Sequence, residues 1–325
     1  MEYRYVESLD AALPRLVYGT GNRAVQGADY PAAADCLAAA WEAGFRAFDT
    51  ANCYGCAEEN LGRWLDESGN RSRAFLLTKG HNCGMRGSVD TYGAETIRRQ
   101  LALSLRRLRT ERVELYILHR DDPSRDVGEI VEALNEARAA GSIGAFGASN
   151  WTLRRVDEAN RYAAAHGLEG FSALSPAYSL AEMVGDPYGG SVTLSGERGG
   201  ALRAYLEKTR LPVFAYSPLA RGFLSGKYRA DALRSGAQSL PADTAAEYLC
   251  PKNLARLARA EQLAAARGTT VSCVCLAWLL SQEMALFPIV GPAGERHMLE
   301  NAAAPGLHLS PQERRWLLSG EENGV

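Results

Sequence analysis

The stretch of sequence that decides the fold is FRAFDTANCYG, residues 45–55. It begins as a short, mostly apolar run of the kind found in buried β-strands, and Asp49 ends that run. A polar loop that carries Tyr54 follows. The arrangement recurs twice downstream, where Lys79 and His119 each end another apolar run. These repeats predict parallel strands whose carboxyl ends carry polar side chains.

Eight such runs alternate along the chain with longer stretches of helical periodicity. Between Ile97 and Leu108, for example, large apolar residues recur at three- and four-residue steps, which predicts an amphipathic helix packed on a sheet. Eight strands that alternate with helices close into an α/β fold of the (β/α)8 TIM-barrel type. We therefore expect one domain over residues 1–325. The predicted strands are Leu16–Tyr18, Phe45–Phe48, Ala74–Thr78, Glu114–Leu118, Ile143–Gly147, Phe171–Leu174, Pro212–Ala215 and Leu286–Val290.

Two long loops and two further helices complete the expected architecture. Ala177–Gly200 and Leu219–Pro251 exceed the usual connection of about two to six residues, and long loops at the carboxyl ends of barrel strands usually cover a ligand. Val271–Leu280 is apolar nearly all round, which predicts a buried helix. Ser310 and Glu313 form a capping box around Pro311, so we expect a closing helix over Gln312–Leu318.

Composition and charge narrow the class of protein. With 46% hydrophobic and 23% charged residues, the chain resembles folded globular proteins and not disordered ones. A formal net charge of −2, without long runs of like charge, predicts no nucleic-acid surface and no anionic-membrane surface, so a small molecule is the expected partner. The polar start Met1–Glu7 predicts no secretory signal, and no apolar stretch is long enough to cross a bilayer. We expect a cytoplasmic protein, whose oligomeric state the sequence does not predict.

The seven cysteines are odd in number and scattered through a long chain, which favours reduced thiols over a disulfide framework. Cys53, Cys56, His81 and Cys83 lie near the ends of two predicted strands and could bind zinc as a group. Their irregular spacing favours reactive thiols beside Tyr54 instead.

The polar groups at the three strand ends form a set that suits carbonyl reduction. Hydride attack on a carbonyl carbon builds an alkoxide, which needs a proton donor and a stabilising charge. Tyr54 is the expected donor, and a nearby Lys79 should lower its pKa from about 10. Asp49 would pair with Lys79, while a neutral His119 could donate a hydrogen bond to the substrate oxygen. Each residue alone is more often structural, but four compatible groups at one barrel mouth favour catalysis.

Five motifs in the chain, the opening stretch among them, resemble the aldo-keto reductase superfamily in order and spacing. The resemblance covers nearly the whole chain and implies a (β/α)8 barrel that reduces an aldehyde or ketone with NADPH. The catalytic residues that it implies are Asp49, Tyr54, Lys79 and His119. The motifs are Phe48-Asp49-Thr50-Ala51-Asn52-Cys53-Tyr54-Gly55, Leu77-Thr78-Lys79, Tyr116-Ile117-Leu118-His119, Gly147-Ala148-Ser149-Asn150 and Ala215-Tyr216-Ser217-Pro218-Leu219.

The resemblance also implies a cofactor site without the usual dinucleotide fingerprint, which this sequence lacks. Ser149 and Asn150 should hold the nicotinamide carboxamide, and Tyr216 should stack on the ring. Residues 217–227 are similar to the family's pyrophosphate-covering loop, in which glycines allow close approach; a plain surface loop is the alternative. Residues 291–301 are similar to the segment that binds the adenosine end. The complete set expected at the cofactor is Thr20, Gly21, Asp49, Ser149, Asn150, Ser175, Tyr216, Ser217, Leu219, Gly222, Lys227, Gly291, Arg296, His297, Glu300 and Asn301.

Two departures from the family's pattern bear on the cofactor. Ser175 stands where many members carry a glutamine beneath the nicotinamide, so it should reach the carboxamide less well. Pro292-Ala293 stands where a basic residue often meets the 2′-phosphate of NADPH. Arg296 and His297 would have to replace that residue, so use of NADH stays open.

Two further departures bear on the substrate. Gly21 and Arg120 stand where well-known mammalian members carry aromatic residues, which predicts a more open and more polar pocket. Together with Asp121, Arg120 favours a sugar-like or hydroxylated carbonyl substrate. The alternative is that residues 120–123 are only a solvated turn.

Two other functions compete with that of a reductase. A cofactor-binding regulatory subunit with slow turnover would carry the same four residues, because some barrels of the resembled family associate with membrane proteins. A metal-dependent barrel hydrolase would need several histidine and carboxylate ligands at strand ends. Only one of the five histidines clearly stands at such a position, which disfavours the hydrolase.

Overall fold

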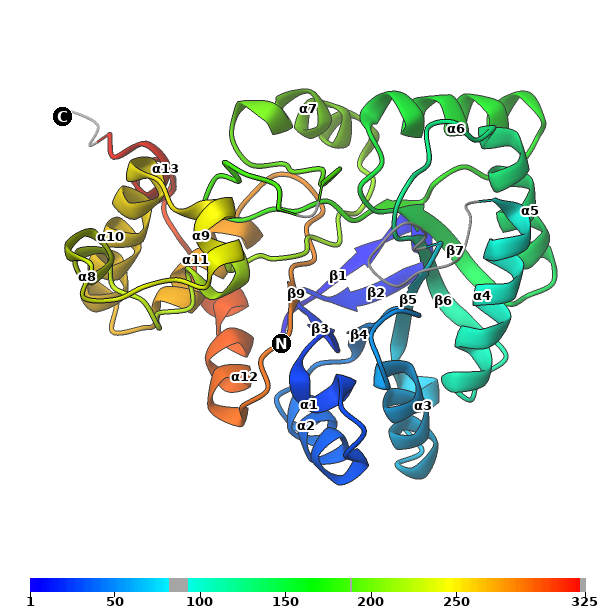
Figure 1. The fold of residues 1–325 in the computed structure, drawn as a ribbon, viewed down its shortest axis with the longest axis horizontal. Helices are drawn as coiled ribbons and strands as arrows, with labels where there is room; N and C mark the ends of the chain where they lie inside the picture. The colour runs from blue at the N-terminus through cyan, green and yellow to red at the C-terminus, as the bar shows by residue number, and fades with distance from the viewer. Residues whose placement is uncertain (82–92, 188, 322–325) are drawn as a thin grey trace.

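The computed structural model describes residues 1–81, 93–187 and 189–321. Its centre is a seven-stranded sheet in which each pair of neighbours is parallel (Figure 1). The strand order is β8-β7-β6-β5-β4-β3-β9. The strands are β3 (Val17–Gly19), β4 (Ala47–Asp49), β5 (Phe75–Gly80), β6 (Val113–Leu118), β7 (Ile143–Ala148), β8 (Ala173–Leu174) and β9 (Ile289–Val290).

The predicted strand Pro212–Ala215 closes the sheet into a barrel, although it pairs only through isolated bridges. Val213 bridges to Leu174 on one side and to Leu286 on the other, both in parallel. The Leu174 amide donates to Pro212 O at 3.0 Å, and the Val213 amide donates to Ala285 O at 2.8 Å. The (β/α)8 barrel is therefore confirmed, with all eight predicted strand positions in the wall.

Helices surround the sheet on the outside, as Figure 1 shows. Their apolar stripes face the strands, and in α4 the buried positions include Ile97 and Leu101, as the periodicity predicts. The principal helices are α2 (Tyr30–Glu42), α3 (Ala57–Glu67), α4 (Ala94–Arg107), α5 (Val127–Ala139), α6 (Leu153–Ala165), α7 (Gly200–Thr209), α10 (Pro251–Ala266), α11 (Val271–Leu280), α12 (Glu295–Ala302) and α13 (Pro311–Ser319). Shorter helices are α1 (Arg23–Gln26), α8 (Ala230–Ser235) and α9 (Ala242–Tyr248).

Local capping fixes where several helices begin. Thr152 and Thr270 accept hydrogen bonds from the first turns of α6 and α11. The capping box predicted for α13 is present, because the Glu313 amide donates to Ser310 Oγ at 3.1 Å and the Ser310 amide donates to Glu313 Oε2 at 2.7 Å. The bounds of α11 agree with the predicted buried helix residue for residue.

An amino-terminal hairpin, absent from the sequence prediction, covers one end of the barrel. Strands β1 (Tyr3–Val6) and β2 (Ala11–Pro14) pair in antiparallel fashion, and the chain then enters β3 directly. Val6 and Leu13 pack into the cluster of side chains that fills the barrel interior. Because the hairpin leads into the amino-terminal end of β3, it leaves the carboxyl ends of the strands open for a site.

The long loop Leu219–Pro251 carries more structure than the sequence predicts. A 3₁₀ turn (Ala220–Gly222) and the helices α8 and α9 lie within it. Figure 1 places α8, α9, α10, α11 and α13 together on one side of the barrel. Within the described ranges, no single helix is long and apolar enough to cross a membrane, and one bent pair, α10 with α11, meets the length and composition test at an angle of 103°.

Gly62 in α3 makes the close contact between α3 and α4, and it supplies a test of the fold. A Cβ added there would lie 2.4 Å from Arg107 O, a backbone atom that cannot move away without a large cost in free energy. Alanine in place of a helix-interior glycine normally stabilises a protein by about 0.5–1 kcal/mol. We expect Gly62→Ala to lower the free energy of unfolding instead, by about 1–3 kcal/mol in urea titrations.

Gly306→Ala is the matched control, because a Cβ there meets no atom within 4 Å. It should change stability by less than about 0.5 kcal/mol. A stabilised Gly62→Ala variant would show that α3 and α4 do not pack as described.

Candidate active site

The innermost feature of the site is an ion pair between Asp49, at the end of β4, and Lys79, near the end of β5. Both residues are 3% exposed. Lys79 Nζ donates to the Asp49 carboxylate and, at 3.1 Å, to Thr50 O. Burial disfavours the charged ammonium and would lower the pKa of Lys79. The charge of the Asp49 carboxylate outweighs this effect, so the pKa of Lys79 is raised. The lysine is therefore a permanent cation in the barrel mouth.

Tyr54 lies in the loop after β4, over this cation. Lys79 Nζ is 5.1 Å from the centroid of its ring. The loop turns at Gly55, which adopts φ +53° and could not carry a Cβ without approaching Gln26 O to 2.8 Å. Burial raises the pKa of Tyr54 to about 12, although Lys79 opposes the increase. The predicted lowering of this pKa is thus wrong, because burial outweighs the charge of Lys79.

His119 follows β6 directly and packs edge-on against Tyr54, with ring centroids 5.8 Å apart and planes at 77°. Its pKa lies well below the usual value, first because of burial and then because of the charges of Lys79 and Arg120. The imidazole is therefore neutral, as predicted. Nδ1 lies 3.7 Å from Cys53 Sγ, and within the described part of the chain Nε2 has no hydrogen-bond partner.

Asn150 joins three strand ends into one network. Its φ of +58° is in the left-handed region, which asparagine tolerates better than most residues. Tyr216 donates to Asn150 Oδ1 at 2.8 Å, and Asn150 Nδ2 donates to His119 O at 3.3 Å. Ser149 Oγ donates in turn to Ser175 O at 2.7 Å. These hydrogen bonds therefore fix the positions of Tyr216, the His119 backbone and the Ser149–Asn150 pair relative to one another.

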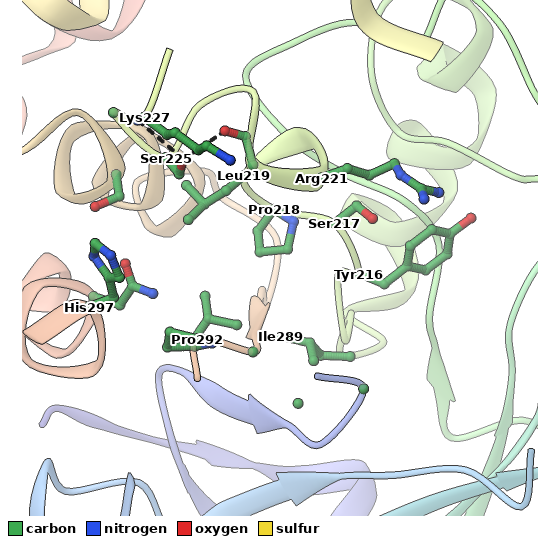
Figure 2. A pocket seen from close by; sticks show the side chains of 18 of the residues that line it. Tyr216, Ser217, Pro218, Leu219, Arg221, Ser225, Lys227, Ile289, Pro292 and His297 are labelled. Carbon is green, nitrogen blue, oxygen red and sulfur yellow. Dashed lines mark hydrogen bonds between the residues drawn. The ribbon is translucent and has the colours of Figure 1, made fainter. Parts of the chain in front are cut away.

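These groups open into a cavity of about 1150 Å³ that runs from the barrel mouth to α12. Figure 2 shows the loop side chains from Tyr216 to Lys227 along one side of it, with Pro292 and His297 from the segment after β9 opposite. The cavity brings together all four predicted catalytic residues and most of the predicted cofactor residues. Those that line it are Gly21, Asp49, Tyr54, Lys79, His119, Ser149, Asn150, Tyr216, Ser217, Leu219, Gly222, Lys227, Gly291, Arg296, His297, Glu300 and Asn301.

Thr20 and Ser175, also predicted at the cofactor, lie behind the cavity wall. Both are fully buried. Thr20 Oγ1 donates to Asp49 O at 3.0 Å, and Ser175 Oγ donates to Phe214 O at 2.8 Å. Their hydroxyl hydrogens are therefore committed to backbone carbonyls of neighbouring strands, which explains why neither side chain reaches the cavity.

The loop of residues 217–227 has an unusual backbone. Ser217, Ala220 and Arg221 all adopt positive φ, at +51°, +49° and +54°, and so do the glycines at 222 and 226. Non-glycine residues in this region cost free energy, and such strain concentrates at functional sites. Successive amides in turns of this kind form concave anion-binding surfaces. The loop geometry therefore fits a phosphate group better than it fits a plain surface loop.

Charges along the cavity fall into pairs. Arg221 lies 3.7 Å from Glu247, a buried residue of α9 that sequence reasoning missed because the loop gives no sign of folding back. At the far end, Glu300 accepts from Arg296 at 2.8 Å and from His297 Nδ1 at 2.9 Å. Lys227, in contrast, has no carboxylate within 4 Å among the residues that the structure describes.

The cysteine group shows no sign of a metal site in the described ranges. No three histidine, cysteine or acidic side chains there are arranged to hold an ion, and Cys83 lies outside those ranges. His81 is buried, accepts from the Gly93 amide at 2.9 Å, and places Nδ1 3.3 Å from Arg120 O. Burial raises the pKa of the Cys53 thiol, which is the opposite of the shift that an activated thiol needs.

Comparison with known proteins decides the family, because the model of the aldo/keto reductase family matches residues 15–316. The chain belongs to this family. An uncharacterized oxidoreductase, YrpG, of Bacillus subtilis is 30% identical over 98% of this chain and 95% of its own. A putative voltage-gated potassium channel subunit beta of Schizosaccharomyces pombe is 28% identical over 89% of this chain and 82% of its own. A crystal structure of an aldo-keto reductase from Klebsiella pneumoniae in complex with NADPH has a TM-score of 0.72 at 26% identity, and covers 98% of this chain and 94% of that one.

Family membership confirms the predicted class of enzyme, an oxidoreductase built on a TIM barrel. It also agrees with the geometry, since the polar groups that sequence reasoning placed at separate strand ends share one cavity. The roles of the individual residues stay predictions.

The buried ion pair gives a stability prediction. Lys79→Met would leave the Asp49 carboxylate buried without a cation, so we expect it to lower the free energy of unfolding by about 3–5 kcal/mol. The double variant Asp49→Asn, Lys79→Met buries no charge and should recover a large part of that loss. Denaturant titrations of both variants measure the difference. If Lys79→Met were as stable as the parent protein, the ion pair could not be buried as described.

Proposed function

We propose that this reductase converts an aldehyde or ketone to an alcohol with NADPH as the hydride donor and Tyr54 as the proton donor. The observation that carries the proposal is the single cavity that joins Tyr54, Lys79 and His119 to the strained loop of residues 217–227. The NADPH bound in the related Klebsiella pneumoniae structure supports the choice of cofactor.

The residues present fit a dinucleotide along the whole cavity. Ser149 and Asn150 would hold the carboxamide, and Tyr216 would stack on the nicotinamide ring. The amides of residues 217–227, with Lys227, would bind the pyrophosphate. Residues 291–301 would bind the adenosine end, and Thr20 and Ser175 would shape the floor from behind. When bound, NADPH supplies the hydride.

Tyr54 has the protonation state that a proton donor needs. With a pKa of about 12 the phenol stays protonated at neutral pH. An alkoxide is a much stronger base than a phenolate, so it takes the proton once hydride has reached the carbonyl carbon. The phenolate left behind faces the ammonium of Lys79, which lowers the cost of its charge.

His119 supplies orientation without a charge. Its neutral imidazole can donate one hydrogen bond to the carbonyl oxygen and polarise it. A protonated imidazole beside Lys79 would repel that cation, which is part of the reason for its low pKa. The carbonyl oxygen would therefore sit between the Tyr54 hydroxyl and the His119 ring.

Removal of the Tyr54 hydroxyl tests the proton donor. We expect Tyr54→Phe to lower kcat for NADPH-dependent carbonyl reduction by about 10²–10⁴-fold, because a general acid contributes about that factor. Binding of NADPH, followed by quenching of protein fluorescence, should stay within about twofold. Retention of a tenth or more of the parent kcat would exclude Tyr54 as the donor.

Cofactor preference depends on the far end of the cavity. A 2′-phosphate near α12 would meet Arg296 and His297, which Glu300 now holds. We expect NADPH to bind more tightly than NADH, and Arg296→Ala with His297→Ala to raise Kd for NADPH about tenfold while that for NADH changes less than about twofold.

Arg161→Ala is the matched control, because Arg161 is exposed like Arg296 and pairs with an acid four residues away on the same helix. It should affect neither cofactor. Equal or tighter binding of NADH by the parent protein would overturn the proposed preference.

A regulatory role is a second candidate, since one relative is named as a putative channel subunit beta. Such a subunit would bind NADPH through the same cavity and turn over slowly. The kcat of the parent protein separates the two functions: values of about 1 s⁻¹ or more favour a reductase, and values several orders of magnitude lower favour the subunit.

A further inference from the structure

We infer that Arg120 is an anion subsite and that the substrates this reductase prefers are carbonyl compounds bearing a carboxylate. The inference rests on the proposed function and adds the chemical class of its substrate. It replaces the sugar-like or hydroxylated substrate that the sequence suggests.

Arg120 stands directly after His119 and lines the same cavity. Its backbone is fixed, because Arg120 O lies 3.3 Å from His81 Nδ1 and accepts from Trp151 Nε1 at 3.2 Å. Among the residues that the structure describes, its guanidinium donates one hydrogen bond, from Nη1 to Gly189 O at 2.8 Å. A guanidinium has five N–H donors in a planar fork, so this bond orients the group and leaves donors for a ligand.

The neighbouring acid that would have neutralised Arg120 is occupied elsewhere. Asp121 accepts two bonds from Arg155, at 3.0 and 3.2 Å, and the side chains of this pair are only 6–7% exposed. Asp122 turns away to accept from Ser124. Arg120 is therefore not part of a solvated charge cluster, and the polar pair that would suit a hydroxylated substrate does not form.

Apart from Lys227, the other charged residues of the described chain that line the cavity have partners of opposite charge. Asp49 pairs with Lys79, and the remaining lining carboxylates, Glu247, Glu261 and Glu300, each have an arginine within 4 Å. In the described ranges of the chain, the lining cations without a carboxylate within 4 Å are Lys227 and Arg120.

These two cations serve different ligands because they lie at different ends. Lys227 lies on the loop that fits the phosphates, away from Tyr216 in Figure 2. Arg120 acts at the catalytic end, where its charge contributes to the lowered pKa of His119 and favours the ionised form of Tyr216. A cation beside the carbonyl-binding residues, and away from the phosphates, selects an anionic group on the substrate itself.

A carboxylate is the anion that fits best. It accepts two parallel bonds from a guanidinium, and such charge-assisted bonds are roughly twice as strong as neutral ones. A hydroxyl group would use one donor and leave the charge uncompensated. The substrate would place its carbonyl oxygen at Tyr54 and His119, and its carboxylate at Arg120.

Matched pairs of substrates test this assignment. We would measure kcat/KM with NADPH for 4-oxobutanoate, 5-oxopentanoate and 6-oxohexanoate, each beside its methyl ester, because the pairs differ in charge and little in length. We expect the acid to exceed the ester at least tenfold for one chain length, and Arg120→Gln to lower that ratio about 10- to 100-fold. Arg120→Lys keeps the charge without the planar fork of donors, so its acid-to-ester ratio should lie between those of the parent and of Arg120→Gln.

Arg125→Gln is the matched control for net charge, because Arg125 lies on the same loop but outside the cavity, 4.0 Å from Glu129. It should leave the acid-to-ester ratio unchanged. A parent ratio near one, or a ratio that falls equally in Arg120→Gln and Arg125→Gln, would overturn the anion subsite while ester reduction still supports the proposed function.

Binding without turnover separates the subsite from the reaction. Calorimetry with butanedioate and its dimethyl ester, in the presence of NADP⁺, asks only whether Arg120 holds a carboxylate. We expect butanedioate to bind more tightly than the diester, and Arg120→Gln to weaken it about tenfold or more. Failure of both esters and acids to be reduced would refute the proposed function, and equal binding of diacid and diester would refute the subsite.

Discussion

The site depends on one interaction, the buried ion pair between Asp49 and Lys79. A lysine that is 3% exposed would lose its charge if it stood alone, because burial favours the neutral amine. Asp49 prevents this and lies within hydrogen-bonding distance. The pair also links β4 to β5 at the barrel mouth, so the charge that the proposed reaction would use is part of the barrel wall.

Burial shifts the pKa values of Tyr54 and His119 in opposite directions, and both shifts suit the proposed proton transfer. A phenol becomes charged when it loses a proton, so burial raises its pKa, to about 12 for Tyr54. An imidazole becomes charged when it gains one, so burial lowers the pKa of His119. Loss of contact with water therefore favours a protonated tyrosine and a neutral histidine. In the proposed reaction, Lys79 would act mainly on the phenolate that the transfer leaves behind.

The strands and the meeting of Asp49, Lys79 and His119 in one cavity could be predicted because they leave local signals. Apolar runs that end at Asp49, Lys79 and His119 mark strand ends, and the capping box of Ser310 marks a helix start. The direction of a hydroxyl group leaves no such signal. Thr20 and Ser175 were expected at the cofactor, yet each donates to a carbonyl on a neighbouring strand and does not line the cavity. The amino-terminal hairpin was missed because Val6 and Leu13 gain their partners only once the barrel interior exists.

Which charged side chains pair with one another likewise depends on the tertiary structure. From the sequence, Arg120 and Asp121 predict a polar pair that favours a hydroxylated substrate, or else a solvated turn. In the folded chain, Arg155 from α6 holds Asp121 in a buried ion pair, while Arg120 donates a hydrogen bond to Gly189 O. At α12 the pairing is local instead, because Glu300 holds Arg296 and His297 on the same helix, and the proposed 2′-phosphate would have to replace it there. The unpaired cation at the catalytic end, Arg120, is therefore a better guide to the proposed substrate than the number of basic residues that line the cavity.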